Sequence, residues 1–233
     1  MVYLVLSGRV RNMKLYYNRL SSASRRVRIA LALLHIAHEV IEIDLTNREH
    51  HEPWYTAIHS QHLVPALETD EGVVLTQSEA IVSWLNDIAD GIPLFGRGPA
   101  EHAAILEIVN VIGCDVHALQ GLRLAHWLEH EGVPDTTFNT IARRAIAEGL
   151  HACERKLAGN AGGPFCLGVQ PRAADIWLIP QMANARRYDV DMTGLPRLMD
   201  IEHACLELDA FRTVMQDNRA HRGEDRSSRS ENP

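Results

Sequence analysis

The chain of 233 residues contains 46% hydrophobic and 23% charged residues and carries a formal net charge of -7. This length suits one large domain or two small ones, and the apolar fraction is sufficient for a hydrophobic core. The negative charge argues against a non-specific nucleic-acid binder, and no apolar run approaches the roughly 20 residues that a membrane-spanning helix needs.

The four cysteines are too widely separated in sequence to form a metal-binding or redox pair. The apolar start at residues 2–6 has no charged segment before it and is shorter than the roughly seven residues of a signal-peptide core. We therefore expect a cytoplasmic protein with reduced thiols, no metal, and neither a nucleic acid nor a membrane as partner.

The first part of the chain predicts alternating strands and helices. Residues 14–17 are strand-like, and apolar side chains recur at helical spacing through residues 27–34. Residues 39–45 alternate polar and apolar, as a half-buried strand does, and a short helix is predicted at residues 54–58.

A hairpin and a further helix follow. Residues 65–69 and 73–76 are strand-like and flank Asp70-Glu71-Gly72, a turn sequence. Ser78 then caps a helix. The predicted order is therefore β-α-β-α-β-β-α, after which a linker rich in Gly and Pro leads into an almost wholly helical pattern.

We divide the chain into four parts. Residues 1–12 precede the first convincing strand and are either a mis-assigned start or a loose extension. Residues 13–92 form an α/β domain, and residues 98–216 form an all-helical domain. Residues 217–233 contain almost nothing that can be buried, so we expect a disordered tail.

Five stretches of sequence resemble a known family. The first is Ser-Ser-Ala-Ser-Arg-Arg-Val-Arg-Ile-Ala-Leu at residues 21–31, and the others lie at residues 63–67, 75–81, 113–117 and 184–193. They resemble the zeta class of glutathione transferases, which includes the glutathione-dependent maleylacetoacetate and maleylpyruvate isomerases; the last two stretches are more typical of the isomerases. The resemblance implies a thioredoxin-like α/β domain followed by an all-α domain, glutathione as cofactor, and a homodimer.

Ser21 and Ser22 lie where the first strand passes into the first helix. Free N–H groups and the positive end of the helix dipole favour an anion there, and a thiolate is such an anion. A hydroxyl that donates to the thiolate lowers the thiol pKa. We expect Ser21 to contact the sulfur, with Ser22 as the alternative, although Ser22 taken alone is typical of an ordinary N-cap. Ala23 fills a place where the family often has Cys or Thr.

The resemblance also assigns residues to the rest of glutathione. It implies a cis peptide bond after Val64, whose backbone pairs with the cysteinyl part. Gln77 and Ser78 are expected to hold the γ-glutamyl carboxylate at the start of a helix, although Ser78 also fits a simple cap. His50 and His62 fall near family positions that touch glutathione, but we expect each to be solvent-exposed.

The substrate implied by the resemblance is a small organic acid that is dianionic at neutral pH, so the site must supply groups that bind carboxylates. Arg187 and Arg123 match the arginines expected for this role, and His117 stands where relatives have His or Gln. The planar guanidinium binds a carboxylate through two hydrogen bonds. On an unbroken helix Arg123 lies about 120° around the axis from His117. Either Gly121 bends the helix or Arg123 points elsewhere.

Our leading hypothesis is a glutathione-dependent cis–trans isomerase of the maleylpyruvate or maleylacetoacetate type, in the degradation of aromatic compounds. Leu20, Gly121 and Leu122 stand where relatives carry polar groups, which favours an alternative: a glutathione transferase, peroxidase or dehalogenase acting on an uncharged electrophile. A third hypothesis is a non-catalytic partner-binding protein with the same fold, supported by Ala23 and by Arg172, which replaces the usual capping hydroxyl.

Three further patterns receive structural interpretations. Residues 126–130 spell the His-x-x-Glu-His pattern of a zinc peptidase group, but no third ligand is evident in the sequence. Asp175 has the spacing of a capping carboxylate. Cys114 has no basic partner nearby in sequence and is interpreted as a small apolar filler.

Overall fold

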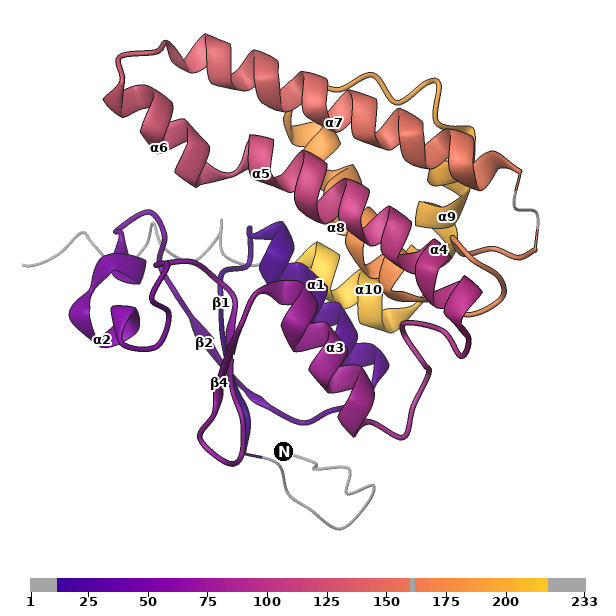
Figure 1. Cartoon of the computed structure of the whole chain (residues 1–233), viewed down its shortest axis with the longest axis horizontal. Helices are drawn as coiled ribbons and strands as arrows, with labels where there is room; N and C mark the ends of the chain where they lie inside the picture. Colours follow the sequence, from indigo (N-terminus) through magenta and orange to yellow (C-terminus); the bar gives the residue numbers. More distant parts are fainter. Residues whose placement is uncertain (1–11, 160–161, 218–233) are drawn as a thin grey trace, which may run out of the picture.

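The computed structural model describes residues 12–159 and 162–217 (Figure 1). Apart from Asn12 and Asp217, the predicted N-terminal extension and C-terminal tail lie outside the described residues. Within the described residues a small α/β domain is followed by a helical domain, so the predicted thioredoxin-like and all-α architecture is confirmed.

The first domain has the predicted succession of strands and helices. Its elements are β1 Lys14–Tyr17, α1 Ser22–Leu33, β2 Glu39–Glu42, the 3-10 helix η1 Glu49–His51, α2 Pro53–Thr56, β3 Ala66–Glu68, β4 Val74–Thr76 and α3 Ser78–Ile88. The strands form one mixed sheet in the order β2-β1-β3-β4, in which β1 and β2 are parallel and β3 is antiparallel to both β1 and β4. Figure 1 shows α1 and α3 between the sheet and the helical domain, and α2 on the opposite side of the sheet.

The two faces of the sheet are covered by different helices. Leu15 and Leu67, which are paired across β1 and β3, are fully buried in the apolar core that α1 and α3 share. Tyr16 and Ala66 face the other way and pack with Tyr55 of α2. This division follows from the two-residue period of a strand, which sends successive side chains to opposite faces.

Two predicted elements have different bounds in the structure. β2 ends at Glu42 instead of residue 45. Among the described strands β2 lies at the edge of the sheet, next to β1, and its Val40 is 50% exposed. Ile41, Ile43 and Leu45 nevertheless pack into the cluster around Tyr16 and Tyr55, whereas the acidic residues between them are exposed. The predicted alternation of a half-buried strand is therefore confirmed from residue 41 to residue 45. α2 begins at Pro53, whose fixed φ suits the first position of a helix, and ends at Thr56.

The second domain is helical. Its elements are α4 Pro99–Asn110, the π-helix η2 Val111–Val116, α5 His117–Gln120, α6 Leu122–His130, α7 Asp135–Ala158, α8 Ala173–Arg187, α9 Pro196–Leu206 and α10 Asp209–Gln216. In Figure 1, α4, α5 and α6 follow one another in a row, and α7 runs back along them. A π-turn inside an α-helix is rare and is often found at functional sites.

Helix α8 connects the two domains. It packs against α4 of its own domain and against α1 of the first domain, and most of its residues from Ala173 to Met182 are fully buried. The Asp175 carboxylate accepts hydrogen bonds from the backbone N–H of Arg172 at 2.7 Å and from that of Cys166 at 2.8 Å. The interpretation of Asp175 as a capping residue is thus confirmed.

The stretch Pro99–His130, which comprises α4 to α6, is long and apolar enough, by length and composition, to cross a membrane, although no such span is expected from the sequence. Core helices of soluble proteins meet the same criterion. Ile105, Ile108 and Val109 of this run are fully buried in the apolar core, so the run uses its apolar face for packing.

Candidate active site

The turn between β1 and α1 is held in place by Asn18. Its side-chain amide donates to the carbonyl of Ile43 at 2.9 Å, and its side-chain oxygen accepts from the N–H of Leu20 at 3.0 Å. The next residue, Ser21, is the N-cap of α1, and its hydroxyl oxygen accepts from the N–H of Ser24 at 3.2 Å. The interpretation of Ser22 as the cap was therefore wrong. Because Ser21 uses a lone pair for capping, its hydroxyl proton remains available to an anion.

Ser22 is the first residue of α1 and faces the helical domain. It is 5% exposed, and its hydroxyl oxygen lies 3.4 Å from Nδ1 of His117 at the start of α5. Burial and the positive charge of Arg26 lower the pKa of His117 to about 3. His117 is thus a neutral imidazole at physiological pH, which supplies one hydrogen-bond donor and one acceptor but no charge.

The Val64-Pro65 peptide bond is cis, as predicted, and lies immediately before β3. The Tyr55 hydroxyl donates to the Leu63 carbonyl at 2.5 Å and so fixes the chain before this bond. Val64 itself is half-buried.

The start of α3 carries Gln77 and Ser78. Gln77 has a φ of 71° and is the N-cap, while its side-chain amide donates to the side chain of Gln61 at 2.7 Å. Ser78 is the first residue of the helix and not its cap, so that part of the prediction was wrong. The Ser78 hydroxyl, which is 9% exposed, accepts a 3.4 Å hydrogen bond from Nη1 of Arg26.

The predicted exposure of His50 and His62 was also wrong. His50 is 9% exposed and His62 is half-buried, because the ring of His51 packs between theirs at centroid distances of 4.2 Å and 5.2 Å. Within the described residues, the Nδ1 atoms of both side chains are buried and have no hydrogen-bond partner, so a polar ligand reaches them only if the side chains around them move.

Gly121 ends α5 with an extended backbone, φ −76° and ψ 147°, and α6 begins at the next residue. Of the two alternatives for Arg123, the break at Gly121 is confirmed. The Arg123 guanidinium lies 5.9 Å from the centre of the Trp127 ring. The pKa of His59, in the first domain, is lowered mainly by the burial of His59 and further by the positive charge of Arg123. The Arg123 charge is therefore felt in the first domain, and Figure 1 shows α6 above α2 of that domain.

Arg187 is the last residue of α8 and is exposed. The following residue, Tyr188, donates from its hydroxyl to the Gln120 carbonyl at 3.4 Å, so the end of α8 lies next to the end of α5. The charge of Arg187 adds to the effects of burial and of Arg28 that lower the pKa of Arg25, in the first turn of α1. Across residues 12–159 and 162–217, neither Arg187 nor Arg123 forms an ion pair.

Comparison with known proteins identifies the fold family. Residues 20–88 match the N-terminal domain of glutathione S-transferases. Maleylacetoacetate isomerase of Rhizobium meliloti is 37% identical over 198 residues, which are 84% of this chain and 92% of that protein. The chain belongs to the glutathione S-transferase family.

Solved structures of zeta-class members are similar to this glutathione S-transferase over nearly their whole length. The holo structure of maleyl pyruvate isomerase, described as a bacterial glutathione S-transferase of the zeta class, is 34% identical with a TM-score of 0.82, covering 86% of this chain and 95% of that one. Maleylacetoacetate isomerase from Methylobacterium extorquens AM1, with bound malonate and GSH, is 35% identical with a TM-score of 0.83, covering 87% and 95%. The resemblance to the zeta class is confirmed.

Several residues at the site of this glutathione S-transferase are not indicated by its sequence patterns. Gln120 and Gln181 are buried and exchange two amide hydrogen bonds, of 2.6 Å and 3.1 Å, that join α5 to α8. They are 61 residues apart, so no local pattern indicates the pair. Arg26 is buried beneath Ser78; an arginine inside an apolar helix is the signal that could have found it. Cys114 is exposed and is not the predicted apolar filler.

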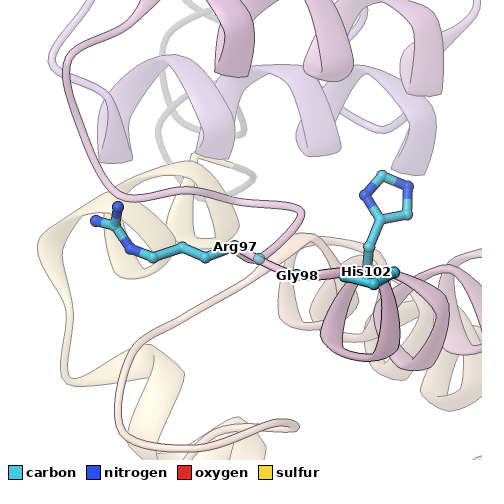
Figure 2. A pocket seen from close by; sticks show the side chains of 5 residues that line it. Arg97, Gly98 and His102 are labelled. Atoms are coloured by element: carbon cyan, nitrogen blue, oxygen red, sulfur yellow. The ribbon is translucent and has the colours of Figure 1, made fainter.

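Two other features of this glutathione S-transferase do not form a site. A shallow hollow in the linker between the domains is lined by Gly96, Arg97, Gly98, Pro99 and His102. Figure 2 shows the side chains of Arg97 and His102 pointing away from each other, so they do not converge on a ligand. His126 and His130 are exposed, and the described part of the chain contains no group of three His, Cys, Asp or Glu side chains that could hold a metal.

Proposed function

We propose that this zeta-class glutathione S-transferase is a glutathione-dependent cis–trans isomerase of maleylpyruvate or maleylacetoacetate. One observation carries the proposal. The first turn of α1 brings together a capping hydroxyl with a free proton on Ser21, the Ser22–His117 pair and, on the helical-domain side, the cation of Arg187, which forms no ion pair with a described residue. A thiolate and a dicarboxylate are the two anions that this combination fits.

The residues present fit glutathione. The unpartnered Nδ1 atoms of His50 and His62 are buried polar groups that lack a hydrogen bond, which is costly unless a ligand supplies it. The Val64 backbone next to the cis bond would pair with the cysteinyl part, and Gln77 and Ser78 would hold the γ-glutamyl carboxylate at the start of α3. The relatives with bound GSH support this assignment.

Bound glutathione supplies a thiol that, once ionised, adds reversibly to the cis double bond and so permits rotation about it. Ser21 donates its hydroxyl proton toward the sulfur, and the free N–H groups of the first turn of α1 add positive potential. Both favour the thiolate and lower the thiol pKa. His117, being neutral, can share a hydrogen bond with the Ser22 hydroxyl without adding charge to the site.

Arg187 and Arg123 bind the carboxylates of the acid from the helical-domain side. Neither guanidinium is neutralised by an ion pair within the described residues, so both retain charge for the ligand and for negative charge that develops on the substrate carbonyl. Malonate, bound in the Methylobacterium relative, is a dicarboxylate of the expected kind. We extend the proposal to a cytoplasmic homodimer whose partners are glutathione and a small dianionic acid, with no nucleic acid or membrane.

The proposal is tested by following the isomerisation of maleylpyruvate and of maleylacetoacetate by the purified protein, with and without millimolar glutathione. We expect acceleration of at least one substrate, and only with glutathione present. Absence of acceleration of both substrates under these conditions would contradict the proposal. Size-exclusion chromatography with light scattering tests the dimer separately.

A transferase acting on an uncharged electrophile is the second candidate. Leu20 and Leu122 are each 53% exposed, and Leu119 is 41% exposed, on the segments that flank Ser21 and His117. Such apolar side chains favour an apolar ligand more than a dianion. Conjugation of an aryl halide together with no isomerase activity would support this candidate.

A further inference from the structure

Arg26 is a buried cation between the two domains. It lies on α1, is 2% exposed, and its guanidinium carbon is 5.1 Å from the centre of the Trp177 ring of α8. The Trp177 ring packs tightly against the backbone of Gly113: a side chain at position 113 would place its Cβ 3.1 Å from the ring Nε1. The guanidinium therefore has a fixed position against the aromatic ring.

The direction of one hydrogen bond follows from the chemistry of arginine. Guanidinium groups only donate, so in the 3.4 Å contact between Nη1 of Arg26 and the Ser78 hydroxyl, the serine oxygen is the acceptor. The Ser78 proton must then point elsewhere. Ser78 is the first residue of α3, where the first N–H groups have no partner within the helix, so its proton is directed to whatever anion binds at that helix end.

The charge of Arg26 is only partly compensated within the described structure. Its Nε and Nη2 are buried without a hydrogen-bond partner, and the guanidinium forms no ion pair with any described residue. The ionisable groups near enough to interact are Glu79 of α3, Cys114 of η2 and His117 of α5. Burial lowers the pKa of Arg26 to about 9, with Glu79 opposing the change, so Arg26 stays charged at neutral pH. A buried charge without a counter-ion is costly, and an incoming carboxylate reduces that cost.

We propose that Arg26 is a positioning residue that acts through Ser78, orienting the serine hydroxyl as a donor to the γ-glutamyl carboxylate of bound glutathione. This inference rests on the proposed function for the identity of the ligand. Arg26 itself does not touch the ligand; it fixes the donor and adds positive potential behind it.

The test compares two ligands by isothermal titration calorimetry: glutathione, and an analogue in which 4-aminobutyrate replaces the γ-glutamyl residue and so removes only the α-carboxylate. The variant Arg26→Met should bind glutathione about tenfold more weakly than the wild type, which is the loss expected for one hydrogen bond to a charged group. Its affinity for the analogue should be unchanged. Arg26→Lys, which keeps the charge, should recover part of the preference for glutathione.

Arg28→Met is the matched control. Arg28 lies on the same helix, but its guanidinium stacks 4.8 Å from the Tyr17 ring and pairs with Asp217 at 2.7 Å, away from Ser78. This variant should keep the wild-type ratio of the two dissociation constants. Melting curves of all variants establish that they are folded, and if Arg26→Met does not fold, Arg26→Gln and Arg26→Lys carry the comparison.

The outcomes separate the two proposals. Equal losses of affinity for both ligands, or no loss for either, would overturn the role of Arg26 while leaving the proposed function intact. If the wild type binds neither ligand, the proposed function fails and the role of Arg26 fails with it. Because binding is measured without turnover, absence of isomerase activity alone leaves this inference standing.

Discussion

The two sides of the candidate site differ in how their polar groups are held. On the glutathione side, the hydroxyls of Ser22 and Ser78 are almost fully buried and each contacts another side chain, while Ser21 caps α1. On the acid side, Arg187 is exposed and Arg123 is half-buried, and neither is paired with a described carboxylate. In the proposed function, the protein therefore holds the hydroxyls assigned to glutathione in fixed positions and leaves the arginines assigned to the acid without an ion pair among the described residues. Substitutions on the first side should change both stability and glutathione binding, whereas those on the second should change affinity for the acid alone.

Ser21→Ala should have the largest effect on activity. Loss of a hydrogen bond to a thiolate costs about 1.5–3 kcal/mol, so kcat/KM should fall roughly 10- to 150-fold and the pKa of bound glutathione should rise. The ultraviolet absorbance of the bound thiolate, titrated with pH, measures that pKa. Loss of the cap should also cost about 1 kcal/mol of stability.

Ser21→Gly is the control for the cap. Glycine at an N-cap costs only a few tenths of a kcal/mol, so this variant should lose the same activity with a smaller change in the free energy of unfolding. If the thiol pKa is unchanged in both variants but rises in Ser22→Ala, the sulfur contact belongs to Ser22.

Arg187→Ala should be next in size. We expect kcat/KM for the acid to fall at least about tenfold, since a charged hydrogen bond contributes roughly 1.5–3 kcal/mol, with the melting temperature and the Kd for glutathione unchanged. Steady-state kinetics with varied acid and saturating glutathione measures this effect.

The neighbouring Arg186 offers a matched comparison. Arg186 is paired with Glu202, whose side chain is only 9% exposed, so Arg186→Ala should lower stability and leave the KM for the acid unchanged. A loss of activity in Arg186→Ala equal to that in Arg187→Ala would remove the distinction between structural and ligand-binding arginines at this helix end.

Gln181→Ala should act mainly on stability. It leaves the amide of Gln120 buried and unpaired, which costs about 1–3 kcal/mol in the free energy of unfolding, measured by urea denaturation. Replacing both residues by leucine should recover part of that loss. Activity of the folded variant should fall only a few-fold, through displacement of α5.

His117→Gln should have the smallest effect near neutral pH. Because burial lowers the pKa of His117 to about 3, the wild type carries no titration of this residue between pH 5 and 8, and the two pH–activity profiles should have the same shape there. In the unfolded chain His117 has its ordinary pKa of about 6.5, so below that pH the unfolded state binds a proton that the folded state does not, and the folded state loses stability. The wild type should therefore lose stability between about pH 6.5 and 3 more steeply than the variant. A kinetic pKa near 6.5 that disappears in His117→Gln would show that the imidazole is solvated.

Much of the glutathione side could be predicted from sequence because its parts are local. Ser21 and Ser22 follow a strand and precede an apolar helix, so any chain with that pattern places them at a helix start. The turn at Val64-Pro65 and the position of Ser78 are likewise set within a few residues. The caps of α1 and α3 were each predicted one residue too late: Ser21 and not Ser22 caps α1, and Gln77 and not Ser78 precedes α3. The exact first residue of a helix depends on local dihedral angles, which the spacing of hydrophobic residues does not specify.

Burial of polar side chains was the main quantity that the sequence did not indicate. His50 and His62 were expected to be exposed, but ring packing through His51 covers them. Cys114 was expected to be buried and is exposed, because the π-helix changes which residues face outward.

The sequence by itself determined the order of elements, the family, and which residues stand at the two helix starts, since these depend on spacing along the chain. Only the tertiary structure decided that Arg26 lies under Ser78, that Gln120 bonds to Gln181, and that His117 is held neutral. The first requires α1 to pack against α3, the second α5 against α8, and the third α5 against α1. Side-chain contact and desolvation between helices have no counterpart in the period of any single helix.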